Sequence, residues 1–254
     1  MTKTLGRVYD LAKVPMSRVE RLDLVILPIG SIERHGNHLP LGTDTLIAEE
    51  VARRVAKKLS EKGYHVGLLP PIWYGYTWSL RHLDGTVSVE AENLAKFVED
   101  ILVTLPSPRI PRILIINGHG GNKEPLEVAV KEALNRLSPG IKIGAVSWWD
   151  MVPKEAFLQA FGTLPSHACE IETSMVMAIC EECVDLGDVE PVPPAERKLL
   201  RSLSETRRAF SRGYMGDPKR AKKEEGERLL EVAAEELARR LLRELESEEE
   251  VGIE

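Results

Sequence analysis

Short, continuous apolar runs alternate with longer segments of helical periodicity along most of this chain. The apolar runs lie at residues 22–29, 65–69, 112–116 and 141–147. Runs of this length that are rich in Val, Ile and Leu are typical of strands buried on both faces of a sheet. Strands that alternate with helices of about ten to fifteen residues predict a mostly parallel sheet covered on both faces. We therefore expect an α/β fold built on such a sheet.

The helical segments are expected at residues 43–60, 89–105, 125–137, 170–182 and 219–250. Thr43 or Asp44 is the expected N-cap of the first helix, because a short side-chain oxygen can accept a hydrogen bond from a free N–H there. Residues 190–218 are rich in Pro and Arg and are expected to form an irregular excursion. No Gly/Ser- or Pro-rich linker divides the first 190 residues, so residues 1–254 are expected to form a single domain.

The charge pattern argues against several classes of partner. The chain holds 34 Lys and Arg against 40 Asp and Glu, a formal net charge of −6, and no basic cluster is interleaved with aromatic residues. A nucleic-acid partner therefore has little electrostatic support. Residues 1–18 lack the apolar core of a signal peptide, and the apolar runs are far too short to cross a bilayer. We expect a cytoplasmic protein with no membrane partner, and the single Gln among abundant Glu, Lys and Arg leans towards a thermophile.

The three cysteines do not make a disulfide framework. Cys180 and Cys183 form a CxxC pair with no second pair and no nearby His, so reduced packing cysteines are the expectation and a zinc clip is the alternative. Reduced thiols agree with a cytosolic protein. Cys169 is expected to fill space in the core.

A first cluster of chemically active side chains follows the strand at 22–29. Glu33 and His35 lie just past this strand and are two residues apart, so on extended backbone both side chains leave the same face. Asp44 follows nine residues after His35, at the start of a helix that a short loop can fold back over that face. The segment therefore offers two carboxylates and an imidazole at one edge of the sheet.

Two further clusters follow later elements. His119 lies in a Gly-rich turn between a buried strand and a helix, which places it at the carboxyl edge of an open α/β sheet, where ligands bind. The third cluster runs from His167 through Glu170 to Glu172 as the chain enters another helix. In this architecture the loops at the strand ends converge, so the three clusters are expected to meet.

Carboxylates and imidazoles without thiolates suit Zn²⁺, Mn²⁺ or Fe²⁺. A shared Asp can bridge two such ions about 3.5–4 Å apart, as in binuclear hydrolases. Each cluster also has a simpler interpretation. A Glu-x-His pair is commonly just two polar residues on the protein surface, and a His in a Gly-rich turn can cap a helix or line a phosphate-binding loop. Acidic residues at a helix start can merely interact with the helix dipole. The coincidence of all three clusters at strand ends favours a metal site.

Four segments resemble the creatininase (creatinine amidohydrolase) family, in order, over roughly residues 20 to 230; they are residues 27–45, 117–122, 167–174 and 215–218. The resemblance implies a three-layer α/β/α fold, a metal centre and a homo-oligomer, often a hexamer. By position, the residues that match the family's metal ligands are Glu33, His35, Asp44 and His119. Asp44 matches the bridging carboxylate.

The same resemblance implies roles around the substrate. His167 matches a histidine that assists proton transfer near the substrate. Residues 76–82 resemble the loop that closes over the substrate, with Ser79 and His82 facing it. Gly120 and Trp149 complete the expected substrate-binding set, although core packing is left open for the pair Trp148-Trp149.

One position departs from the family pattern. Creatinine hydrolases carry a metal-binding Glu two residues after the histidine that matches His119, and this chain has Gly121 there. Glu172 or Glu170 could supply the missing ligand; we prefer Glu172, which is also expected to share the catalytic work with His167. The departure argues against creatinine as substrate. Members with the Gly-rich turn resemble archaeal deformylases of a formylaminopyrimidine nucleotide, or peptidases that mature a peptide-derived redox cofactor.

The expected function is therefore metal-dependent hydrolysis of a non-peptide C–N bond, a cyclic amide or a formamide, in a small molecule, with one or two divalent ions (Zn, Mn or Fe). A divalent ion lowers the pKa of bound water towards about 7 and stabilises an oxyanion, and His167 is expected to protonate the departing nitrogen. Two alternatives stay open: a peptidase that matures a peptide-derived cofactor, and a non-catalytic metal-binding module. An ion closed off by four protein ligands would support the metal-binding module.

Overall fold

A five-stranded, fully parallel sheet forms the centre of the protein, in a computed structural model that describes residues 5–193, 199–200 and 202–251. The strand order is β1-β3-β2-β4-β5. The strands are β1 (Val8–Asp10), β2 (Leu24–Ile29), β3 (Val66–Leu68), β4 (Arg112–Asn117) and β5 (Lys142–Ser147). The prediction of a mostly parallel sheet is confirmed. Only the three-residue edge strand β1 was not expected, because a strand of that length carries no periodicity to recognise.

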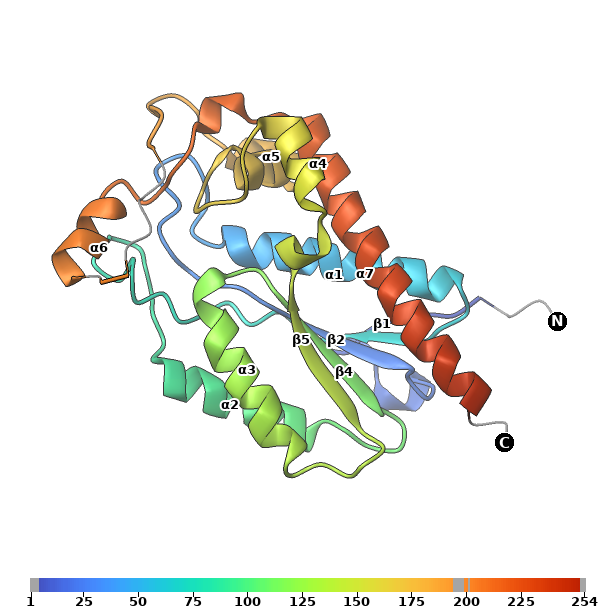
Figure 1. Ribbon diagram of the computed structural model, residues 1–254. Helices are drawn as coiled ribbons and strands as arrows, with labels where there is room; N and C mark the ends of the chain where they lie inside the picture. Colours follow the sequence, from blue (N-terminus) through green and yellow to red (C-terminus); the bar gives the residue numbers. More distant parts are fainter. Residues whose placement is uncertain (1–4, 194–198, 201, 252–254) are drawn as a thin grey trace.

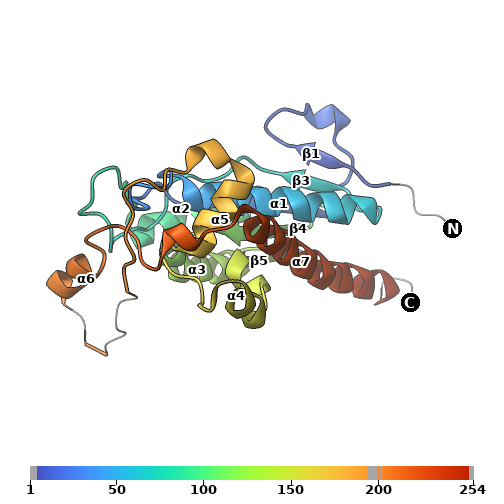
Figure 2. The ribbon, with the colours of Figure 1, turned by 90° about the horizontal axis from the view of Figure 1, so that it is seen from above.

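Helices cover both faces of this sheet, which gives the three predicted layers (Figure 1). The α-helices of the described residues are α1 (Thr43–Glu61), α2 (Ala91–Thr104), α3 (Lys123–Leu134), α4 (Lys154–Phe161), α5 (Glu170–Ile179), α6 (Leu203–Ala209) and α7 (Lys223–Val251). Helices α2 and α3 pack on one face, whereas α1, α5 and the long α7 lie on the other. Seen from above, α6 projects away from the sheet, at the end opposite to the two chain termini (Figure 2).

The alternation of side chains along β2 explains why this strand reads as continuously apolar. Val25, Leu27 and Ile29 pack under α2 and α3, while Leu24 and Ile26 pack against α1 and its neighbours. All six residues of β2 are buried. Because the two faces have separate cores, a central strand needs apolar side chains in both directions.

Several predicted boundaries were wrong. Gly42 is the N-cap of α1, and neither Thr43 nor Asp44 caps it, since the Thr43 hydroxyl donates to the nearby carbonyl of Pro40 and the Asp44 carboxylate accepts from Ser31. The last helix begins at Lys223, after a short 3-10 turn, η5 (Pro218–Arg220). The excursion at 190–218 is not wholly irregular, because it contains α6, where Ser202 and Glu205 form a capping box.

The prediction of reduced cysteines at Cys180 and Cys183 was wrong, because the two form a disulfide. Helix α5 ends at Ile179, earlier than expected, and the chain turns through the 3-10 segment η4 (Glu181–Cys183). This turn brings the two Cα atoms to 5.3 Å, within the range that a disulfide spans. Cys169 is free and buried as expected, and its burial raises the pKa of its thiol to about 11.

None of the helices in the described part of the chain is long and apolar enough to span a membrane.

Candidate metal centre

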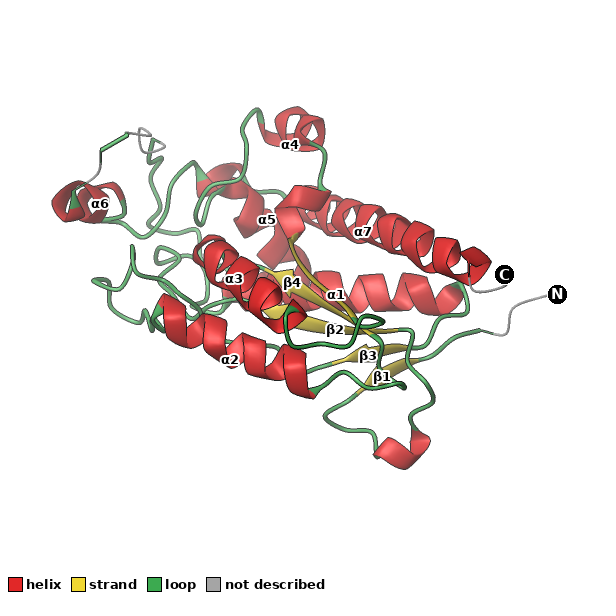
Figure 3. Cartoon of the chain, turned by 60° about the horizontal axis from the view of Figure 1, so that its bottom comes forward, coloured by secondary structure: helices red, strands yellow, loops and turns green. Residues whose placement is uncertain are grey.

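The three clusters meet at the carboxyl edge of the sheet. The loop after β2 carries Glu33 and His35, the turn after β4 carries His119, and the segment before α5 carries His167. Asp44 joins them from the first turn of α1. The loops that gather there lie beyond the ends of the strand arrows (Figure 3). The parallel sheet therefore brings together side chains up to 134 positions apart, from Glu33 to His167.

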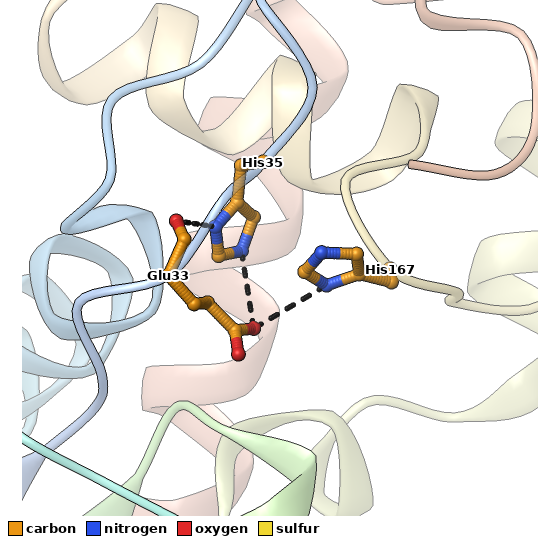
Figure 4. Close-up of side chains that lie close together, drawn as sticks. All are labelled: Glu33, His35 and His167. Carbon is orange, nitrogen blue, oxygen red and sulfur yellow. Dashed lines mark hydrogen bonds and ion pairs between the residues drawn. The ribbon is translucent and has the colours of Figure 1, made fainter. Parts of the chain in front are cut away.

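Glu33 lies at the centre of the cluster. Its side chain is fully buried, and neither carboxylate oxygen has a hydrogen-bond partner within the described residues. Glu33 Oε1 instead lies 3.2 Å from His119 Nδ1, 3.4 Å from His167 Nδ1 and 3.9 Å from His35 Nε2. Figure 4 shows the carboxylate between the rings of His35 and His167. A buried carboxylate without hydrogen bonds is costly, and a cation bound among these atoms would offset that cost.

Each of the three histidines is oriented by a backbone carbonyl. His35 Nδ1 lies 3.1 Å from the carbonyl oxygen of Glu33, His119 Nε2 lies 3.0 Å from that of Tyr76, and His167 Nε2 lies 2.8 Å from that of Arg34. Since a carbonyl only accepts, each of these nitrogens carries the proton. The other nitrogen of each ring is therefore turned towards Glu33, which is the arrangement of metal-binding histidines.

Asp44 lies between two of these rings. Its Oδ1 is 3.1 Å from His35 Nε2 and its Oδ2 is 3.0 Å from His119 Nδ1, while Ser31 Oγ donates to Oδ2 at 2.6 Å. Burial would raise the pKa of the Asp44 carboxyl, but the charge of His35 and hydrogen bonds from His119 and His35 hold it well below its usual range. Asp44 is thus an anion that faces both sides of the cluster.

Without a metal, protons on the histidines compensate the carboxylates. Burial would lower the pKa of His35, but Asp44 and Glu33 raise it to about 9. Burial is likewise outweighed at His119, whose pKa is raised well above its usual value by Glu33 and Asp44. A divalent cation binding here would displace these protons, so its affinity is expected to rise with pH.

Two groups of ligand atoms in the described residues are compact enough for an ion, with all atoms of a group within 4.8 Å of one another. One consists of Glu33, Asp44 and His119, the other of Glu33, His35 and His167. Neither contains Glu172 or Glu170. The four ligands matched by resemblance therefore lie together, and His167, expected near the substrate, also lies beside Glu33.

Glu172 lines the same cavity without joining either group. Its Oε2 accepts a hydrogen bond from the backbone N–H of Ala168 at 2.6 Å, and burial raises the pKa of its carboxyl to about 8. Glu170 has a different function in the fold, because its Oε2 accepts from the N–H of Asp217. Of the two carboxylates considered for the missing ligand, Glu172 is the one that faces the site.

A cavity of about 300 Å³ opens beside the cluster. Of the predicted substrate-binding residues, Ser79, Gly120 and Trp149 line it. His82 is not among its lining residues, and His82 Nε2 is buried without a hydrogen-bond partner in the described part of the chain. The remaining lining residues are Glu33, Asp44, Leu80, Gly118, His119, Gly121, Pro165, Ser166, His167, Glu172 and Phe210.

Two features of the cavity were missed from the sequence or left open. Phe210 forms part of the wall, although it comes from the excursion after α6, and nothing in its local sequence marks it. The two residues of the pair Trp148-Trp149 lie in different places: Trp148 is fully buried in the core, whereas Trp149 lines the cavity. The excursion at 190–218 thus contributes to the site.

A parallel α/β sheet that holds buried carboxylates and imidazoles at its carboxyl edge, next to a cavity, defines the class of metal-dependent α/β hydrolases. The family model for creatininase, described as creatinine amidohydrolase, matches residues 13–241. The chain belongs to the creatininase family. It is a metal-dependent amidohydrolase of that family.

Individual relatives agree with this assignment. The creatinine amidohydrolase of Pseudomonas putida is 29% identical over 239 residues, which cover 87% of this chain and 90% of that protein. A mycofactocin precursor peptide peptidase of Mycobacterium ulcerans is 33% identical over 234 residues, covering 86% of this chain and 84% of the relative. A 2-amino-5-formylamino-6-ribosylaminopyrimidin-4(3H)-one 5'-monophosphate deformylase of Methanobrevibacter ruminantium matches over 99 residues at 30% identity, 38% of this chain and 39% of its own length.

The fold of the chain is that of solved creatininases. A manganese creatininase structure superposes with a TM-score of 0.84 at 26% identity, covering 94% of this chain and 99% of that chain. The prediction of a creatininase-like three-layer fold is therefore confirmed.

Proposed function

We propose that this protein hydrolyses the C–N bond of a cyclic amide or formamide in a small molecule, with one or two divalent ions held by Glu33, His35, Asp44 and His119. The observation that carries the proposal is the carboxylate of Glu33, which is fully buried, has no hydrogen-bond partner among the described residues and faces three imidazole nitrogens. Oxygen and nitrogen ligands without a thiolate favour Zn²⁺, Mn²⁺ or Fe²⁺.

An ion bound there would supply an acidified water and a positive charge for the developing oxyanion. Neighbouring residues of the protein fix the orientation of the ligand side chains. Ser31 fixes one oxygen of Asp44, and the backbone carbonyls of Glu33 and Tyr76 fix the rings of His35 and His119. Because these orienting contacts are already made, little reorganisation is needed when the substrate arrives.

His167 and Glu172 are proposed to handle protons. His167 directs Nδ1 into the cavity while Nε2 donates to the carbonyl of Arg34, so the ring can take up a proton and pass it to the departing nitrogen. Glu172, with its pKa raised by burial, can hold a proton at neutral pH. We also propose Glu172 as the residue that completes the ligand set, because it is the further carboxylate of the cavity wall.

The cavity supports a small substrate. Its volume of about 300 Å³ is at the lower end of ligand pockets, and Leu80, Trp149 and Phe210 give it an apolar wall. Ser79 is proposed to hydrogen-bond the substrate from the loop at 76–82. We propose His82 as a second residue of that loop that turns towards bound substrate, although it lies outside the lining. The chain is further proposed to form a homo-oligomer.

A second candidate activity is hydrolysis of a short carrier peptide. It is favoured by the relatives named mycofactocin precursor peptide peptidase, which match over most of the chain. A peptide needs a longer, open groove, whereas this cavity has an aromatic wall on the side of Phe210. A purely structural ion is less well supported, because structural sites are closed by protein ligands and this cluster opens into a cavity.

Metal analysis combined with a substrate screen tests the proposal. The panel holds formamides, lactams, cyclic ureides, creatinine and short peptides, each assayed with Zn²⁺, Mn²⁺ or Fe²⁺. His119→Ala is expected to lose bound metal and hydrolysis together. His65→Ala is the matched control, since His65 lies before β3 at the opposite edge of the sheet. Stoichiometric metal retained by His119→Ala would overturn the assignment, and a metal-loaded protein inactive on every substrate would favour the binding module.

A further inference from the structure

His38 belongs to the first histidine-rich segment, yet it does not face the cavity. Its side chain is 1% exposed, and it is not among the residues that line the cavity or form the two groups of ligand atoms. A buried histidine this close to a metal centre, but turned away from it, requires a separate explanation.

The His38 ring is fixed on several sides. Its Nε2 lies 3.1 Å from the carbonyl oxygen of Ala168, so Nε2 carries the proton and donates. Its Nδ1 faces Gly36, where an added Cβ would lie 2.5 Å away, and has no partner in the described part of the chain. Tyr214 packs edge-on against the ring, with 5.2 Å between ring centroids. The backbone N–H of Asp185 donates to the His38 carbonyl at 3.0 Å.

The residue that accepts from His38 is in an unfavourable conformation. Ala168 has a φ of +49° and is the one non-glycine residue with positive φ in the part of the chain that the structure describes. For an L-residue the left-handed region is strained, and it persists only where surrounding contacts hold it. The bond from His38 is one such contact.

The turn at Ala168 connects both proposed proton-handling residues. His167 precedes it directly, and its carbonyl accepts from the N–H of Met215 at 2.9 Å. The N–H of Ala168 itself donates to Glu172 Oε2 at 2.6 Å. If the turn relaxed, the ring of His167 and the carboxylate of Glu172 would both lose their orientation towards the cavity.

We propose that His38 is a positioning residue, whose Nε2–H holds the carbonyl of Ala168 so that the left-handed turn keeps His167 and Glu172 directed at the substrate. The inference rests on the proposed function for the roles of His167 and Glu172. A neutral ring suits this task because it donates one hydrogen bond without adding charge beside the carboxylates and imidazoles of the cluster. Burial lowers the pKa of His38 to about 4, so the ring is neutral in the neutral pH range.

Two substitutions of similar length separate the hydrogen bond from packing. In His38→Gln the amide nitrogen can still donate near the position of Nε2, whereas His38→Met fills similar space without a donor. The metal held by Glu33, His35, Asp44 and His119 is expected to be retained in both variants, because neither substitution touches these four residues. We expect kcat to fall at least about tenfold in His38→Met, with a smaller change in KM, because a lost buried hydrogen bond of roughly 1.4 kcal/mol corresponds to a factor of ten. In His38→Gln, which keeps the donor, we expect kcat to stay within about threefold of the wild type.

A readout independent of activity is the hydrogen exchange of the Ala168 amide, measured with the full chain and metal present. Exchange is expected to be about tenfold faster in His38→Met and near the wild-type rate in His38→Gln, with the amide of Ile115 in β4 unchanged in both. Should His38→Met yield no folded protein, His38→Asn replaces it, because its amide ends near the position of Nδ1 and cannot reach Ala168.

Three results would overturn the inference. The first is wild-type kcat and Ala168 exchange in His38→Met; the second is a loss in His38→Gln as large as in His38→Met. The third is faster exchange at Ile115 to the same extent as at Ala168, which would mark a general loss of stability. A wild-type protein that binds no metal and cleaves no C–N bond would overturn the proposed function instead, while the exchange of Ala168 would still decide whether His38 holds the turn.

Discussion

The carbonyl oxygen of Tyr76 occupies the space that a side chain at Gly121 would need, since a Cβ added to Gly121 would lie 2.1 Å from it. The same oxygen accepts the Nε2–H of His119 at 3.0 Å. The glycine therefore allows the loop at 74–78 to approach His119 and fix its ring. The Glu that creatinine hydrolases are expected to carry at this position has no room here unless that loop moves, which agrees with a substrate other than creatinine.

Replacing Gly121 by Ala is expected to weaken metal binding. The new methyl group would push Tyr76 away and release the Nε2 side of His119, and loss of such an orienting hydrogen bond typically costs about 10–100-fold in metal affinity. The measurement is a competition titration with a chelator, together with the melting temperature of the metal-free protein.

Gly120→Ala is the matched control for this change. A Cβ at Gly120 meets no atom of the described residues within 4 Å, so metal affinity and melting temperature are expected to stay near the wild-type values. Equal metal affinities for the two alanine variants would contradict the explanation given for Gly121.

The architecture followed from the sequence because it depends on patterns that are local. Buried strands such as β2 and β4 are continuous apolar runs, and helix α2 repeats its apolar residues at helical spacing. Strand β1 and helix α4 have only three and eight residues, and they obtain their stability from neighbours rather than from a recognisable period.

The candidate site was only partly predictable for the same reason. Glu33, His35, Asp44 and His119 follow strand ends, and the topology of a parallel sheet is sufficient to bring them together. The position of Phe210 depends on the path of a long excursion, and that path is set by tertiary contacts. The disulfide at Cys180–Cys183 depends on where α5 ends, a boundary that the apolar pattern placed too late.

Removal of the metal is expected to destabilise the protein, because the free energy of metal binding is lost and protonated histidines then face Glu33 in place of the ion. At a hundredfold excess of metal over its Kd, binding stabilises by about 2.7 kcal/mol, which is roughly 5–10 °C in melting temperature for a chain of this size. In Glu33→Gln the buried charge and a ligand are both absent, so adding metal or chelator should shift the melting temperature little. Differential scanning calorimetry with and without chelator measures this, and a full metal-dependent shift in Glu33→Gln would contradict the central role of Glu33.

Phe210→Ala is expected to weaken substrate binding and leave the metal centre intact. Phe210 lines the cavity, and its ring packs edge-on against that of His167, with 6.1 Å between centroids. An aromatic contact worth about 1–1.5 kcal/mol corresponds to roughly a tenfold higher KM. Steady-state kinetics on the best substrate of the screen measure the change, with metal content determined in parallel.

The control for Phe210 is Phe97→Ala, which removes a phenyl ring that is 53% exposed on α2. Its KM is expected to equal that of the wild type. An unchanged KM in Phe210→Ala would show that the excursion after α6 does not contact the substrate.

Acid is expected to destabilise the wild type more than His38→Gln. Burial lowers the pKa of His38 from its usual 6.5 to about 4 in the folded protein. The unfolded chain therefore binds a proton below about pH 6.5 that the folded protein does not take up until about pH 4. The contribution of the neutral ring to stability is fully present above pH 6.5 and is lost as the pH falls towards 4, by at most about 3 kcal/mol.

Glutamine does not titrate. The free energy of unfolding of metal-free His38→Gln should therefore fall less between pH 6.5 and pH 4 than that of the metal-free wild type. At pH 7 the two free energies should be similar. Urea unfolding at a series of pH values measures both curves, and identical acid dependence would mean that the pKa of His38 is the same in the folded and the unfolded protein, so that burial does not keep the ring neutral between pH 6.5 and pH 4.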